Sequence, residues 1–198
     1  TDAINVNKVM PQNTDIKYIY TDIIFGHPGQ FPIIDLSDTP IDIANNIIRV
    51  VQPVELKISY FSGEFHQHPV LQLMMDVYKN HNKNKFEVYG FSHDPEGENN
   101  YRNEAKGYFD KFIDITKMND DDVVKLCREM EIDIAINLTG HTVNARDNIF
   151  YHHVAPIQIN YLGYPGTLGS KIYDYIIADK IILPKKFEKN YSEKVLYL

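Results

Sequence analysis

The stretch that decides the fold is "LKISYFSGEFHQHPVLQLMMDVYKNHNKNKFEVYGFS", residues 56–92. It begins and ends with short runs rich in aromatic and β-branched residues, "LKISYFS" and "KFEVYGFS", and each reads as a buried strand. Between them, "HPVLQLMMDVYKNH" has the periodicity of a helix. A strand, a helix and a second strand in this order predict a parallel pair, because parallel strands need a crossover longer than a hairpin.

The same alternation continues to the end of the chain. Further strands are predicted at 112–116, 133–138, 156–162 and 173–179, and the sequence stops at "SEKVLYL", inside what reads as another strand. Further helices are predicted at 100–111, 119–132 and 144–154. The sequence therefore predicts an α/β fold: a Rossmann-like, doubly wound, mostly parallel sheet with helices on both faces.

The first part of the chain has a different character. Its first thirty residues show no sustained period and are expected to be irregular. The segment "SDTPIDIANNIIRVVQP", residues 37–53, predicts a helix, since Thr39 can cap it, Pro40 suits the first turn and Pro53 closes it. We expect an entry segment over 1–54, followed by a lobe over 55–198.

Composition narrows the class of protein. With 43% hydrophobic and 24% charged residues, the chain is typical of globular proteins. A net charge of -7 without a basic stripe argues against a partner with a phosphate backbone such as nucleic acid. The run "PKKFEK" is interrupted by Phe187 and Glu188, so it reads as a solvated turn rather than a binding patch.

The cellular location of the protein is predicted from its cysteine count and from the absence of long apolar runs. A single cysteine, Cys127, excludes an internal disulfide and reads as a small buried hydrophobe, which favours a reducing, cytoplasmic location. No apolar run approaches the ~20 residues needed to span a bilayer, and no signal peptide is visible, so no membrane partner is expected. Because the sequence begins without Met and stops inside a strand, we infer a piece of a longer protein.

Polar or glycine-rich loops follow three of the predicted strands. They are "SGEFHQHP" after the first strand, "TGHTVNAR" after the fourth and "GYPGT" after the fifth. Ligands of open α/β sheets bind outside the carboxyl ends of the strands. All three loops fall on that edge, so we expect them to share one site.

Three histidines in these loops are candidates for chemistry. His66, His68 and His141 could together bind a metal, but no HExxH or CxxC pattern accompanies them, which favours a site without metal. His68 directly precedes Pro69 at the start of a predicted helix. From that position its imidazole either accepts a proton in the cleft or simply hydrogen-bonds the turn, and the sequence leaves both open.

For other residues near the same edge, a purely structural role is an alternative to ligand binding. Arg146, in the first turn of its predicted helix, either binds an anion or pairs with Asp147 or Glu131. His152 and His153 are expected in the body of that helix, where packing or solvation is their role.

The glycine-rich stretch "NYLGYPGT", residues 160–167, matches neither a dinucleotide-binding loop nor a Walker loop. Its tyrosines form either a stacking platform or part of the core. Its small residues are expected to let the backbone approach a ligand.

These loops also carry a resemblance. "LKISYFSGEFHQHPV", "DIAINLTGHTVNAR", "APIQINYLGYPGTLG" and "YSEKVLYL", in this order and spacing, resemble the catalytic region of the O-linked N-acetylglucosamine transferase family, which includes the SPINDLY-type proteins. The resemblance covers residues 31–198. It implies a two-lobed GT-B glycosyltransferase, of which this chain is the amino-terminal lobe.

The resemblance also implies an activity and its partners. Members of the family move N-acetylglucosamine from UDP-GlcNAc to Ser or Thr hydroxyls of proteins, with inversion and without a metal or other cofactor. The expected partners are the nucleotide sugar, a protein or peptide acceptor and the second lobe, which would bring the positive charge for the diphosphate. Tetratricopeptide repeats would lie before the lobe. This chain alone is therefore expected to be inactive.

The resemblance also assigns the family's site residues to individual positions of this sequence. The resemblance places His68 and His141 at catalytic positions, and it implies that Thr142, Arg146, Gly163, Tyr164, Pro165, Gly166 and Thr167 contact substrate. The sequence departs from the family pattern at His66 and Gln67, where Gly and Asn are more usual, at His153, where many members have Arg, and at Tyr161, where many have Trp. Two alternatives stay open: a binding or scaffold lobe that has lost catalysis, and a metal-dependent hydrolase.

Overall fold

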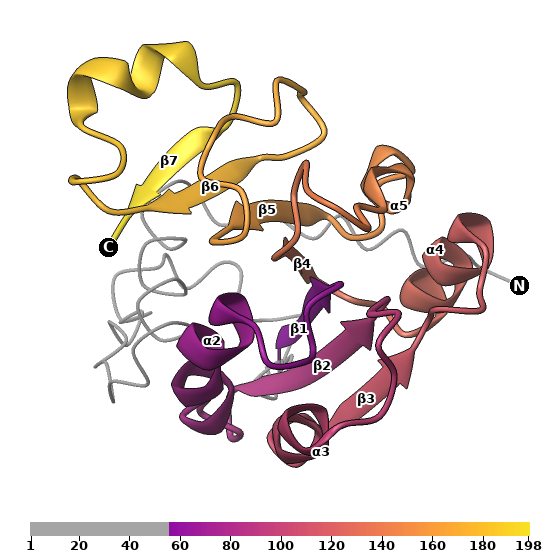
Figure 1. Ribbon diagram of the computed structural model, residues 1–198. Helices are drawn as coiled ribbons and strands as arrows, with labels where there is room; N and C mark the ends of the chain where they lie inside the picture. The colour runs from indigo at the N-terminus through magenta and orange to yellow at the C-terminus, as the bar shows by residue number, and fades with distance from the viewer. Residues whose placement is uncertain (1–55) are drawn as a thin grey trace, which may run out of the picture.

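One seven-stranded sheet organises residues 56–198 (Figure 1). The computed structural model describes residues 56–198. The predicted helix at 37–53 lies outside the described residues, as does the segment predicted to be irregular. The elements are β1 (Leu56–Ser62), α2 (Pro69–Lys79), β2 (Phe86–Ser92), α3 (Asn100–Lys106), β3 (Lys111–Asp114), α4 (Asp120–Glu129), β4 (Ile134–Asn137), α5 (Asp147–Tyr151), β5 (Ile157–Tyr161), β6 (Tyr175–Ala178), the 3-10 helix η3 (Lys185–Asn190) and β7 (Lys194–Tyr197).

The strands lie in the order β3-β2-β1-β4-β5-β6-β7, and every neighbouring pair is parallel. Ile58 in the central strand β1 is in register with Val88 of β2 on one side and Ile134 of β4 on the other. The chain therefore leaves β1 in one direction to build β2 and β3, and then returns to build β4 to β7 on the other side. This reversal is the topological switch point of a doubly wound sheet, and the predicted fold class is confirmed.

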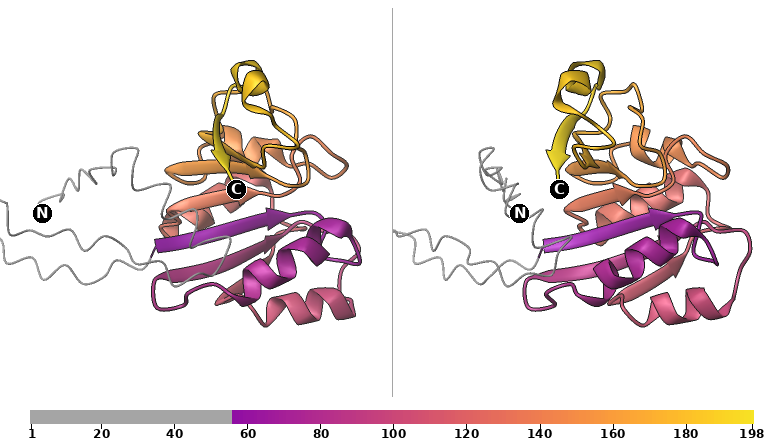
Figure 2. Two further views of the ribbon diagram at one scale, coloured as in Figure 1. Left: turned by 90° about the vertical axis from the view of Figure 1, so that its left-hand side faces the viewer. Right: turned by 60° about the vertical axis from the view of Figure 1, so that its left-hand side comes forward.

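Helices cover both faces of the sheet. Ile58 and Tyr60 of β1 pack in the same core cluster as residues of α2 and α3, whereas Phe61 packs with residues of α4 and α5. This alternation is the period-2 pattern of a strand buried on both sides. Figure 2 shows β1 and β2 pointing the same way, with α2 and α3 on the same side of them. All strand ends that matter for the site therefore meet at one edge.

Helix starts follow local capping chemistry. Pro69 occupies the first turn of α2, and the residue before it, His68, caps the helix through its side chain. Asn119 caps α4 by accepting a hydrogen bond from the Asp122 backbone N–H at 2.8 Å. Three acidic residues then fill the first turn of α4, where they favour the helix dipole.

All four helices predicted within residues 56–198 are shorter than the sequence suggested, and two of them differ most. The helix predicted over 144–154 has only five residues, because Asn144 and His153 adopt left-handed backbone angles, φ 66° and 51°, that no α-helix can continue through. His152 is the C-cap and His153 lies beyond it, so the prediction that both sit in the body of the helix is wrong. The helix predicted over 100–111 ends at Lys106.

Cys127 is fully buried against the sheet in α4, as predicted, and burial raises the pKa of its thiol to about 12. A thiol in that state is not a nucleophile at neutral pH. Within residues 56–198, no helix is both long and apolar enough to cross a bilayer.

Candidate active-site cleft at the switch point

A cleft of about 370 Å³ opens at the carboxyl ends of β1, β2, β4 and β5. It lies beside the switch point between β1 and β4, where doubly wound sheets bind ligands. Its lining residues come from the loops after these strands: Gly63, Glu64, His66, His68, Val70, Pro95, Glu96, Thr142, Val143, Asn144 and Gly163.

A hydrogen-bonded carboxylate forms part of the cleft wall. Glu64 accepts hydrogen bonds from the hydroxyls of Ser62, at 2.9 Å, and Thr139, at 3.0 Å. The same Thr139 hydroxyl accepts from the backbone N–H of Gly63 at 3.0 Å. These contacts connect the end of β1 to the end of β4 and fix the Glu64 carboxylate at the cleft.

His93, the first residue after β2, lies behind this wall. Its Nε2 is 3.4 Å from the Thr139 hydroxyl. Burial, helped by the positive charge of Arg146 and opposed by the negative charge of Asp120, lowers its pKa to about 4. His93 is therefore neutral near pH 7 and brings no positive charge to the cleft.

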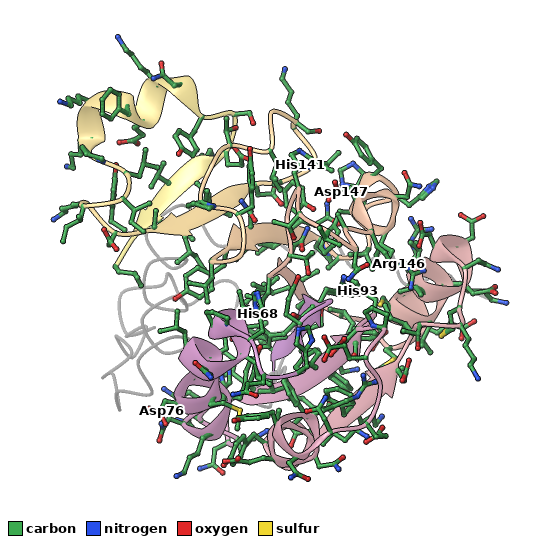
Figure 3. All side chains as sticks on the ribbon, in the orientation of Figure 1. His68, Asp76, His93, His141, Arg146 and Asp147 are labelled. Carbon is green, nitrogen blue, oxygen red and sulfur yellow. The ribbon has the colours of Figure 1, made fainter. Side chains whose placement is uncertain are left out.

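His68 lines the cleft at the N-terminus of α2 (Figure 3). Its Nδ1 accepts a hydrogen bond from the Val70 backbone N–H at 3.3 Å. A neutral imidazole whose Nδ1 is an acceptor carries its hydrogen on Nε2. The structure thus shows the helix-capping alternative for His68, with the hydrogen of the neutral ring on Nε2.

His141 holds two segments of the site together. Its Nδ1 donates to the Asp147 carboxylate at 2.8 Å, and its Nε2 donates to the Leu168 carbonyl at 3.1 Å. Both partners are acceptors only, so both ring nitrogens carry hydrogens and the imidazolium form is favoured. Partial burial lowers the pKa, but the bonds to Leu168 and Asp147 outweigh it and raise the pKa of His141 above its ordinary value.

This contact predicts a pH dependence of stability. The bonds of His141 are fully formed below about pH 6.5, the pKa in the unfolded chain, and their contribution is lost as pH rises through the higher folded pKa. We expect the free energy of unfolding of the wild type to exceed that of His141→Gln at about pH 6, and the gap to narrow at alkaline pH. Denaturant unfolding across this range measures it, with His152→Gln as a control for an exposed histidine. A gap that stays constant with pH would contradict the imidazolium assignment.

Arg146 faces α4 rather than the cleft (Figure 3). Its guanidinium donates to the Asp120 carboxylate, to the Ile115 carbonyl at 2.8 Å and to the Met118 carbonyl at 2.8 Å. Neither Asp147 nor Glu131 is its partner, so that alternative from the sequence is wrong. Arg146 joins the loop before α5 to the loop before α4.

The glycine loop packs against the end of β4. A Cβ on Gly163 would lie 1.9 Å from the Leu138 carbonyl oxygen, and a Cβ on Gly140 would lie 2.4 Å from the Cβ of Tyr164. The Tyr164 side chain contacts the core and meets the His141 ring edge-on at 5.6 Å. These glycines are required by contacts within the protein, whereas the sequence suggested that small residues here let the protein backbone approach a ligand.

A buried carboxylate at the start of β7 fixes the far end of this loop. Glu193 is 4% exposed and accepts hydrogen bonds from the Thr167 hydroxyl at 2.6 Å and from the Leu168 backbone N–H at 2.7 Å. Tyr191 adds a hydrogen bond from its hydroxyl to the Pro165 carbonyl at 3.0 Å. The loop is therefore held on both sides, by β4 and by β7.

The predicted site residues divide into two groups. His68, Thr142 and Gly163 line the cleft. The remaining predicted residues hold the surrounding loops: His141, Arg146, Tyr164, Pro165, Gly166 and Thr167. Within 56–198, no three His, Cys, Asp or Glu side chains are arranged to hold a metal ion, so the structure does not assemble His66, His68 and His141 into one ligand set.

Sequence reasoning missed the loop after β2 and the role of Glu193. Pro95 and Glu96 reach the cleft from the segment "HDPEG". The strand-end rule that selected the other loops would have found it, had it been applied to the second strand. No local signal marks Glu193, because its partners lie 25 or 26 residues away in sequence.

The strand order and the polar cleft at the switch point define the class: a Rossmann-like, doubly wound lobe with a candidate ligand cleft at the carboxyl ends of its strands. Comparison with known proteins identifies the family. Residues 34–198 match the family described as Glycosyl transferase family 41, and the chain belongs to that family. The glycosyltransferase prediction is confirmed at this level.

Named relatives agree with this assignment. The chain is 35% identical over 143 residues to a probable UDP-N-acetylglucosamine–peptide N-acetylglucosaminyltransferase SEC of Arabidopsis thaliana, covering 72% of this chain and 15% of the relative. It is 32% identical over 165 residues to the Caenorhabditis elegans UDP-N-acetylglucosamine–peptide N-acetylglucosaminyltransferase. That match covers 82% of this chain and 14% of the relative.

A solved structure supports the fold. A mutant of the Thermobaculum terrenum O-GlcNAc transferase superposes with a TM-score of 0.70 at 29% identity, covering 73% of this chain and 28% of that one. The chain thus spans about one seventh of the length of the curated relatives named above, and just over a quarter of the solved structure.

Proposed function

We propose that this chain is the acceptor-side lobe of an inverting glycosyltransferase that moves N-acetylglucosamine from UDP-GlcNAc to Ser or Thr hydroxyls of proteins. The observation that carries the proposal is the composition of the cleft. Among residues 56–198, its lining includes two carboxylates and two histidines, and no Lys or Arg. Such a set can hold a hydroxyl and accept its proton, but it offers no positive charge to a diphosphate.

The reaction needs a base and a positive charge, and only the base is provided by this cleft. In an inverting transfer, the acceptor oxygen attacks the sugar carbon while the diphosphate departs, so a base and a positive charge are needed on opposite sides. The described cleft contains groups suited to the first role. A second lobe would supply the second, and the names of the relatives support UDP-N-acetylglucosamine and a peptide as substrates.

The test uses the full-length protein that carries this sequence. It is incubated with radiolabelled UDP-GlcNAc and a Ser/Thr-rich acceptor peptide, with UDP-glucose and other nucleotide sugars as alternative donors. We expect label on the peptide from UDP-GlcNAc, and none above background from the 198-residue chain alone. UDP binding without transfer from any donor would contradict the proposal and favour a binding lobe. A cytoplasmic location stays a prediction.

A further inference from the structure

A second histidine of the cleft, His66, is arranged differently from His68. Its Nδ1 lies 3.0 Å from Oδ2 of Asp94, a carboxylate whose side chain is fully buried. The other oxygen of Asp94 accepts the Glu96 backbone N–H at 2.9 Å. Asp94 is therefore held rigidly, and it takes a hydrogen bond from Nδ1 of His66. In the neutral imidazole, this leaves Nε2 of His66 as a bare acceptor.

His68 has the opposite tautomer. Its Nδ1 accepts the Val70 N–H, so its Nε2 carries the hydrogen in the neutral ring. To accept a proton at Nε2, His68 would first have to give up the hydrogen bond that caps α2. His66 can accept a proton while keeping every hydrogen bond that it makes in the described structure.

The charges around His66 suit that role. The groups that face it are Asp94, Glu96 and His68. Glu96 Oε1 lies 3.6 Å from His66 Nε2, too far for a hydrogen bond, and its side chain is 62% exposed. Glu96 therefore makes no hydrogen bond that would occupy Nε2, which leaves this nitrogen free to meet a substrate hydroxyl. The His66 ring is 18% exposed and lines the cleft.

We propose that His66 is the proton acceptor of the transfer reaction and that Asp94 is its positioning residue. The inference rests on the proposed function. In the step, the acceptor hydroxyl oxygen forms a bond to the anomeric carbon as the bond from that carbon to the UDP oxygen breaks. The hydroxyl proton passes to His66 Nε2, and UDP leaves with the bonding electron pair. A buried carboxylate that orients an imidazole through Nδ1 is a recurring arrangement for a general base.

Kinetics of the full-length protein test the role of His66. We expect His66→Asn to lower kcat roughly 100-fold or more, with little change in KM for UDP-GlcNAc. His66→Gln should behave in the same way, which guards against a folding defect in one variant. His68→Asn keeps a residue that caps helices well while it removes the imidazole, so it should lose much less activity than His66→Asn. His152→Ala, on the exposed end of α5, should match the wild type.

The positioning role of Asp94 is tested by measurements other than activity alone. Asp94→Asn should lower kcat, and it should shift the acidic limb of the pH–rate profile, since the amide can no longer select the Nδ1–H tautomer. Histidine-selective nitrogen NMR should show Nδ1–H at His66 in the wild type and Nε2–H in Asp94→Asn. A variant that only lowers the stability of the fold would not change the tautomer of His66.

The outcomes separate the two proposals. If the wild type transfers nothing, the proposed function fails, and the inference fails with it. If the wild type is active and both His66 variants stay within about threefold of it, the proposed function stands and the inference is overturned. An Nε2–H tautomer at His66 in the wild type would also overturn it.

Discussion

Replacement of Gly163 by alanine is expected to destabilise the protein by about 3 kcal/mol or more. The added Cβ would lie 1.9 Å from the Leu138 carbonyl oxygen, 2.9 Å from its carbonyl carbon and 3.3 Å from the Thr139 Cα. All three neighbours are backbone atoms at the end of β4, so no side chain can rotate to make room. Either the loop or the strand end has to move.

The same loop provides a matched control. Gly169 has a left-handed backbone, φ 65°, but a Cβ added to it would meet no atom within 4 Å. Its replacement by alanine therefore costs only backbone strain, about 1 kcal/mol. Denaturant unfolding of both variants separates collision from strain. Equal losses for the two would show that the loop adapts freely and that Gly163 is not a packing constraint.

Loss of the Arg146 guanidinium is expected to have a similar effect, about 3 kcal/mol for Arg146→Lys. The planar group serves one carboxylate and two carbonyls at once. A lysine ammonium has three donors on a flexible stem and cannot reproduce the fork, so at least one half-buried acceptor is left without a partner. Arg146→Met, which also removes the charge opposite Asp120, should be worse.

Arg128→Lys is the control for Arg146, because Arg128 is exposed and bonds only the His152 carbonyl among the described contacts. It should change the free energy of unfolding by no more than about 0.5 kcal/mol. Chemical unfolding is measured for both variants, and UDP binding is measured in the full-length protein. An Arg146→Lys protein that is as stable as the wild type but binds UDP more weakly would return Arg146 to the role of an anion ligand.

The sheet was predictable because its signals are local. The runs around Ile58 and Val88 carry the composition of buried strands, and the helical period between them requires a parallel crossover. The position of the site followed from the same elements, since parallel strands bring their carboxyl ends to one edge.

The roles within the site were not predictable, because they depend on contacts distant in sequence. Spacing in the sequence cannot distinguish His66 from His68. In the structure, His66 bonds the carboxylate of Asp94, which lies 28 residues away, whereas His68 accepts a hydrogen bond from Val70, only two residues away. Arg146 was placed near its partner candidates in sequence, whereas its actual partner, Asp120, is 26 residues earlier. The short α5 was missed because a left-handed Asn144 gives no signal in a pattern of hydrophobic residues.

The attachment of the glycine loop to β7 also affects how the protein is made. Glu193, the residue before β7, reaches back to Thr167 and Leu168 and is synthesised after both. While the ribosome is still adding residues, the strands up to β6 can pair, but one side of the cleft lacks the carboxylate that fixes it. A nascent chain halted before Glu193 would therefore lack the carboxylate that fixes Thr167 and Leu168, and the glycine loop is held on both sides only once Glu193 has been added.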